Sequence, residues 1–128
     1  MEHGLELTNS AEKLLKDGLR ALFIFSITDL FFQEKADDEK DLGAALQTVY
    51  SDLEGRFGIK VLGTLDDDLL QVGPTRNAPI SYILAEVPNV EAVIAVTNLI
   101  RTRFKGAKLA RYLTVEARVG HPLFFGTK

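Results

Sequence analysis

The chain of 128 residues contains no cysteine and only two histidines, His3 and His121. Without cysteine the protein has no disulfides, zinc–thiolate sites, iron–sulfur clusters or thiol catalysis. Two histidines are too few for a histidine-rich metal site within one chain. Long hydrophobic runs are also missing, since the longest largely apolar stretch, residues 19–27, falls well short of the roughly 20 residues that span a bilayer. We therefore expect neither a metal centre nor a membrane segment.

Basic residues are not in excess. The 15 lysines and arginines are outnumbered by 18 aspartates and glutamates, which gives a net charge of −3. Nucleic-acid-binding domains usually show a basic footprint, so we expect no nucleic-acid partner. The first ten residues have no basic segment followed by an apolar run, and the lack of such a secretory signal favours a cytoplasmic protein. The G-x-S-x-G, Walker and G-x-G-x-x-G motifs are absent too, which argues against α/β-hydrolase, P-loop and Rossmann chemistry.

The residues that are present describe an ordinary globular domain. Hydrophobic residues make up 46% and charged residues 26% of the chain, and its length is enough to bury a core. We expect an N-terminal extension over residues 1–18, with a short helix over residues 11–17, and a single domain over residues 19–128.

Composition and periodicity predict the secondary structure. Aromatic and β-branched residues indicate strands over residues 19–28, 59–65, 80–87 and 109–119. Apolar residues at three- and four-residue steps predict a helix over residues 37–57, which Gly58 ends, and Asn89 is placed to cap a helix over residues 90–104. The β-α-β-β-α-β order predicts an α+β, ferredoxin-like fold, with two helices on one face of a single sheet.

Alternate residues of a strand point to opposite faces of the sheet. One set is apolar apart from Ser81, and we assign it to the face that the helices cover: Ala21, Phe23, Phe25, Ile27, Ile59, Val61, Gly63, Leu65, Ser81, Ile83, Ala85, Val87, Leu113, Val115, Ala117 and Val119. The other set is mixed: Arg20, Leu22, Ile24, Ser26, Thr28, Lys60, Leu62, Thr64, Asp66, Ile80, Tyr82, Leu84, Glu86, Tyr112, Thr114, Glu116 and Arg118.

The mixed set has too many leucines for a fully solvated face and too many charges for a dry core. A second copy of the same sheet, packed against this face, accommodates both kinds of residue. We therefore predict a homodimer that forms a closed barrel with a lined pocket inside it. A different partner chain covering the same face is the alternative.

The order of elements over residues 19–120 resembles the dimeric α+β barrel superfamily, which includes cofactor-free monooxygenases, muconolactone-isomerase-like enzymes and haem-binding members. Four segments are similar to the small IacB-type proteins, which are encoded beside bacterial genes for the breakdown of indole acetic acid: residues 61–68 (VLGTLDDD), 72–74 (VGP), 81–88 (SYILAEVP) and 115–120 (VEARVG). The resemblance implies a homodimer in a small aromatic acid pathway. It carries over no catalytic residue.

Glu116 and Arg118 share one face of the last expected strand with Tyr112 and Thr114. Inside a barrel, Arg118 would clamp the carboxylate of an anionic ligand. The same pair could instead be an ion pair that sets the register of the dimer, and both interpretations stay open.

Tyr82 and Glu86 share one face of the third expected strand. Tyr82 would wall a pocket, together with Ser26 and Phe31, and Glu86 would accept a proton if an apolar cavity raised its pKa. The simpler interpretation places Tyr82 at an interface and Glu86 in solvent near the strand end. Apolar residues outside the expected helices and strands need cover as well, either as a pocket entrance or as part of a dimer contact: Leu30, Phe31, Phe32, Phe124 and Phe125.

His121 follows the last expected strand and would act as a general base, or as a haem or metal ligand at the barrel mouth; otherwise it is an exposed loop histidine. Residues 66–68 are three aspartates without the glycine and glutamate of an EF-hand, which indicates a solvated turn rather than a calcium site. The basic residues between 101 and 111 indicate a solvated helix end in an acidic protein, rather than a nucleic-acid site.

These observations predict a small homodimer that binds a small aromatic or cyclic acid, and they leave open whether it transforms the acid by cofactor-free oxygenation or isomerisation. In an enzyme, Glu86, Glu116 or His121 would move the proton and Arg118 would hold the anion, while Tyr82 and Phe31 would wall the ring. A ligand-binding or assembly module without catalysis is the alternative. Haem binding, which would depend on His121 alone, is a third hypothesis.

Overall fold

The computed structural model describes residues 18–28, 37–74, 78–104 and 107–126. The expected extension over residues 1–17, with its short helix, and the candidate residue Phe31 lie outside the described residues. Among the described helices, none is both long enough and apolar enough to cross a membrane.

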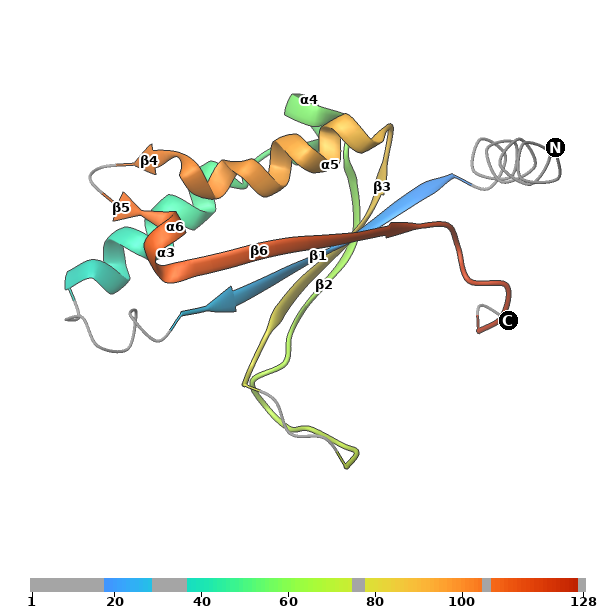
Figure 1. Cartoon of the computed structure of the whole chain (residues 1–128), viewed down its shortest axis with the longest axis horizontal. Coiled ribbons are helices and arrows are strands. Elements are labelled where there is room, and N and C mark those ends of the chain that lie inside the picture. Colours follow the sequence, from blue (N-terminus) through green and yellow to red (C-terminus); the bar gives the residue numbers. More distant parts are fainter. Residues whose placement is uncertain (1–17, 29–36, 75–77, 105–106, 127–128) are drawn as a thin grey trace, which may run out of the picture.

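Four strands form one antiparallel sheet in the order β2-β3-β1-β6. The strands are β1 (Leu19–Ile27), β2 (Lys60–Asp66), β3 (Ser81–Val87) and β6 (Leu113–Gly120). The larger helices, α3 (Asp37–Val49) and α5 (Val90–Thr97), lie together on one side of the sheet (Figure 1). This arrangement confirms the α+β, ferredoxin-like fold that the sequence predicts.

The core lies between the sheet and the helices, in two clusters. Phe23 and Ile59 are fully buried in the first cluster, together with Val93 and Val96 of α5. The second cluster joins α3 to a short helix, α6 (Leu109–Tyr112), and contains Leu42, Ala45, Val49, Leu109 and Tyr112. Burial on this side confirms that the helices cover the apolar face, and none of the described helices lies on the mixed face.

The expected helix over residues 37–57 is interrupted. It ends at Val49 and resumes as α4 (Leu53–Phe57), because Asp52 adopts a left-handed backbone with φ 46° and ψ 51°. The Asp52 carboxylate accepts a hydrogen bond from the Gly55 backbone N–H at 3.1 Å, which caps α4. Aspartate is among the residues that tolerate this conformation and cap helices, so a continuous helix was the wrong prediction here. Gly58, at φ 70°, ends α4 as expected.

The expected fourth strand over residues 109–119 begins only at Leu113, and the expected helix over residues 90–104 ends at Thr97. A 3₁₀ helix, η1 (Asn98–Arg101), and two short paired strands, β4 (Arg103–Phe104) and β5 (Ala107–Lys108), lie between α5 and α6. Leu109 and Tyr112 are three residues apart, so a helical turn buries both on one side, whereas a strand would point them to opposite faces. Tyr112 is therefore not on the mixed face.

A β-bulge in β2 changes which residues face the helices. Val61 pairs with Ala85, but after an irregularity at Leu62 it is Gly63 that pairs with Leu84. One extra residue reverses the alternation of every later side chain in the strand. Gly63 and Leu65 thus lie on the face away from the helices and Thr64 and Asp66 on the helix side, the reverse of the sequence prediction for these four residues.

The start of α5 depends on the Asn89 side chain, whose oxygen accepts a hydrogen bond from the Ala92 backbone N–H at 2.8 Å. Asn89→Ala leaves this N–H without its cap, so we expect the free energy of unfolding to fall by about 1 kcal/mol. Urea denaturation measures the loss. Asn89→Ser provides a control, because serine is a comparable N-cap and should retain most of the stability; equal losses in the two variants would refute this role for the cap.

Candidate functional site

The sheet face away from the helices, here called the open face, is organised in rows that run across the strands. The first row contains Lys60, Glu86, Arg20 and Gly120; the second contains Gly63, Leu84, Leu22 and Arg118; the third contains Leu65, Tyr82, Ile24 and Glu116. Figure 1 shows the described helices on the other side of the sheet. The second and third rows therefore present largely apolar side chains with one charged residue at the β6 end, whereas the first row is charged except for Gly120.

Two hollows in the open face meet at Leu22 and Leu84. The first has a volume of about 420 Å³, and its lining also includes Gly63, Thr64, Leu65, Asp67 and Tyr82. The second has a volume of about 360 Å³, and its lining includes Arg20, Ala21, Arg118, Val119, Gly120, His121, Pro122 and Leu123. Together they form a depression with an apolar floor and a cationic end.

Arg20, Arg118 and His121 come together at the cationic end because β1 and β6 are paired, with Leu22 opposite Arg118 and Arg20 opposite Gly120. The Arg20 Nε is buried and has no hydrogen-bond partner among the described residues. A buried N–H without a partner is unfavourable, and a guanidinium matches the geometry of a carboxylate. The cationic end can therefore accept the carboxylate of a small acid.

The His121 ring lies at the rim of this hollow. Its Nδ1 is 3.0 Å from the Pro122 carbonyl oxygen, which can only accept a hydrogen bond. In the neutral imidazole this contact places the proton on Nδ1 and leaves Nε2 as the basic nitrogen. No group of three His, Asp or Glu side chains that could hold a metal occurs in the described part of the chain.

Tyr82 walls the first hollow and is held by Asp67. The Tyr82 hydroxyl donates to Asp67 Oδ2 at 3.2 Å, while the backbone N–H of Ile80 donates to Asp67 Oδ1. Desolvation and the adjacent carboxylate raise the pKa of Tyr82, so its hydroxyl remains protonated as a donor. Asp67 thus has a structural role at the base of the β2–β3 connection.

The remaining candidate residues from the sequence lie on both sides of the sheet. Glu86 is exposed beside Lys60 and Arg20, and Glu116 and Arg118 are both exposed, with no ion pair between these two in the single chain. Ser26 is half-buried on the open face, and its carbonyl accepts a long hydrogen bond from the Thr114 hydroxyl. Tyr112, predicted to bind the ligand, is instead buried against α3 and lies on the wrong side of the sheet for this site.

Arg20 and Gly63 are the site residues that sequence reasoning missed. Arg20 carried a signal, since it is a charged residue two positions from Leu22 in a strand that is otherwise largely apolar. Gly63 carried none, because only the bulge brings it to the open face. A β-carbon added at Gly63 would meet no atom within 4 Å, so the space above this residue is open.

Comparison with known proteins finds structures of similar fold. No family model matches the chain, and no curated protein does. The crystal structure of the RPA0582 protein of unknown function from Rhodopseudomonas palustris is 18% identical, with a TM-score of 0.50 over 84% of each chain. The structure of methylated RPA0582 protein is also 18% identical, with a TM-score of 0.51 over 87% of this chain and 85% of that one. At this identity, the similarity shows that the chain shares the α+β fold of these structures.

Proposed function

We propose that this protein is a homodimer that binds a small aromatic or cyclic acid on its open face. The observation that carries the proposal is the buried Nε of Arg20, which has no hydrogen-bond partner in the described part of the chain and lies in the same hollow as Arg118 and His121. The carboxylate of the acid lies against the two arginines. Its ring lies on Leu22 and Leu84, where the two hollows meet.

The shape and polarity of the depression fit this ligand class. Each hollow is within the range of roughly 300–1,000 Å³ that is typical of small-molecule sites. Leucines and the Tyr82 ring supply apolar contact, and arginine is well suited to bidentate recognition of a carboxylate. The resemblance to the IacB-type proteins of indole acetic acid breakdown points to the same ligand class.

A second copy of the chain would cover the open face. The central row exposes apolar surface, with Leu84 38% exposed. The rows also carry both signs of charge, Arg20, Lys60 and Arg118 against Glu86 and Glu116, so a two-fold axis can bring opposite charges together. More apolar surface needs cover beyond the sheet: Leu69 is 95% exposed on the segment that projects after β2 (Figure 1), and Phe124 is 90% exposed in the C-terminal segment.

If the protein is an enzyme, the chemistry we propose is cofactor-free oxygenation or isomerisation of the bound acid. The basic Nε2 of His121 is the group best placed to take a proton at the rim of the cationic hollow. Glu86 and Glu116 are more exposed candidates on the same face. Without turnover, the same geometry describes a ligand-binding protein.

The proposal predicts that indole-3-acetate and phenylacetate raise the melting temperature, whereas the matched amides do so much less, because only the acids offer a carboxylate to the arginines. Hydrogen bonds between charged groups contribute about 1.5–3 kcal/mol, so Arg118→Met should weaken binding of the acid roughly 10- to 150-fold. Isothermal titration calorimetry measures this change, and mass spectrometry of the incubated acid distinguishes an enzyme from a binder.

Arg101→Met is the matched control, since Arg101 is an exposed arginine in η1 and does not line either hollow. It should bind the acids like the original protein. Amides that bind as tightly as the acids, or an Arg118→Met variant with unchanged affinity, would show that the cationic hollow is not a carboxylate site.

A further inference from the structure

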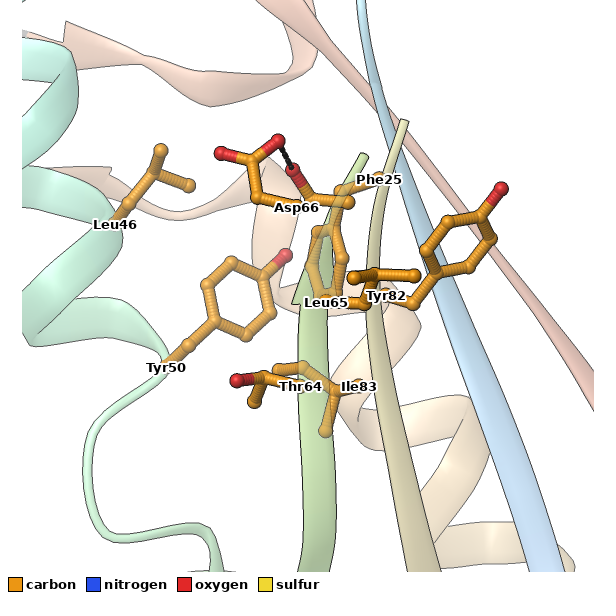
Figure 2. Close-up of a pocket in the computed structure, with 9 residues that line it drawn as sticks. Phe25, Leu46, Tyr50, Thr64, Leu65, Asp66, Tyr82 and Ile83 are labelled. Atoms are coloured by element: carbon orange, nitrogen blue, oxygen red, sulfur yellow. Dashed lines mark hydrogen bonds between the residues drawn. The ribbon is translucent and has the colours of Figure 1, made fainter. Parts of the chain in front are cut away.

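The opposite side of the sheet contains a second concave site, between α3 and the β2–β3 edge (Figure 2). It is a groove of about 270 Å³ whose apolar lining includes Phe25, Leu46 and Ile83. Tyr50, which directly follows α3, points its hydroxyl from the helix toward the strands in Figure 2. Thr64, Leu65 and Tyr82 line both this groove and the first hollow of the open face. The groove contains neither Arg20 nor Arg118, so the cationic end of the open face does not extend into it.

The Tyr50 hydroxyl oxygen is buried and has no hydrogen-bond partner among the described residues. The ring cannot easily turn away, because it packs edge-on against Phe25, with centroids 5.2 Å apart and planes at 86°. Burial raises the pKa of Tyr50 well above its ordinary value, so the hydroxyl is neutral and can both donate and accept. A buried hydroxyl in this state is satisfied when a polar atom of a ligand reaches it.

The β2 bulge places Asp66 and Thr64 on the side of the groove. Asp66 accepts a hydrogen bond from the Ser81 hydroxyl at 3.3 Å, drawn in Figure 2, and its carboxylate remains exposed to solvent. No lysine, arginine or histidine occurs among the described residues that line the groove. The charge here is therefore negative, in contrast to the cationic end of the open face.

We propose that this groove binds a small arylalkylamine, a cation in which a short chain joins an aromatic ring to an amine. The ring packs on Phe25, Leu46 and Ile83, and the ammonium group donates to the Tyr50 hydroxyl. The Asp66 carboxylate at the mouth supplies the opposite charge. The protein would thus bind an acid on one face of the sheet and an amine on the other.

The test is calorimetric titration of the full chain with phenethylamine, with 2-phenylethanol and 3-phenylpropionate as neutral and anionic probes of similar size. We expect the amine to bind most tightly, with a two- to five-fold preference over the alcohol, as is typical of an exposed ion pair. Asp66→Asn should abolish that preference. Tyr50→Phe should weaken binding of the amine roughly 2- to 12-fold, the range for one net hydrogen bond.

Two further measurements separate this site from the open face and from a folding defect. Arg118→Met should bind phenethylamine like the original protein, so the result does not depend on the function proposed above. Tyr50→Phe keeps the ring and removes only a hydroxyl that has no hydrogen-bond partner among the described residues, so its melting temperature should not fall. A lower melting temperature, unchanged affinity for the amine in both groove variants, or equal binding of the acid would overturn the proposal.

Discussion

Phe23→Ala is expected to lower the free energy of unfolding by about 3–5 kcal/mol, which is the usual range for a large-to-alanine substitution in a core. Phe23 is fully buried at the centre of β1, between Ile83 of β3 and Ala117 of β6, and it belongs to the cluster that contains Val93 and Val96. Removing its ring loses apolar contact and leaves a cavity between the sheet and α5. A domain of this size is stable by only about 5–15 kcal/mol, so the loss is a large share of the total.

Urea denaturation at one fixed protein concentration measures this loss, because the stability of a dimer depends on concentration. Val90→Ala is the control, since Val90 is 49% exposed at the start of α5, on the helix side of the sheet. We expect that variant to change the free energy of unfolding by less than about 0.5 kcal/mol. A loss below about 1 kcal/mol for Phe23→Ala would mean that the core is not built around this ring.

Leu84→Asp is expected to dissociate the proposed homodimer. Leu84 lies in the middle row of the open face, beside Leu22, and its partial exposure lets a folded single chain keep the aspartate in water. In the dimer the same carboxylate is buried without a partner in both copies. An uncompensated buried charge costs about 3–5 kcal/mol, so we expect the dissociation constant of the dimer to rise a hundredfold or more.

Sedimentation equilibrium of the original protein and of the Leu84→Asp variant, across a concentration series, measures the dissociation constant of the dimer. Ile94→Asp is a matched control, because Ile94 is 53% exposed on α5, on the far side of the sheet. It should leave the association unchanged. Leu22→Asp should repeat the result of Leu84→Asp on the neighbouring strand, and a normal dimer in either variant would rule out the open face as the interface.

Several features of the fold could be predicted from sequence because their causes are local. Asn89 caps α5 through a hydrogen bond to a residue three positions away, and Gly58 ends α4 by adopting a positive φ. β-Branched and aromatic residues predict the strands. The alternation of side chains along β1 and β3 correctly separates the face that the helices cover from the mixed face. Each of these signals depends on neighbours within a few residues.

The failures have a common cause, which is competition between local pattern and packing. The bulge at Leu62 is invisible in the alternation of β2, because the residues on either side continue the same apolar pattern. Residues 109–112 are compatible with a strand, but a helical turn lets Leu109 and Tyr112 both pack against α3. Tyr112 was consequently assigned to the wrong side of the sheet.

The sequence by itself determined the order of the elements, the α+β class and the presence of one sheet face with mixed polarity, because caps, glycines and periodicity act over short distances. Only the tertiary structure decided which side chains meet. The antiparallel pairing of β1 with β6 brings Arg20 into one hollow with Arg118 and His121, and the bulge turns Thr64 and Asp66 toward Tyr50. Register between distant strands is decided by how well the whole set of side chains packs, and no short segment of the chain contains that information.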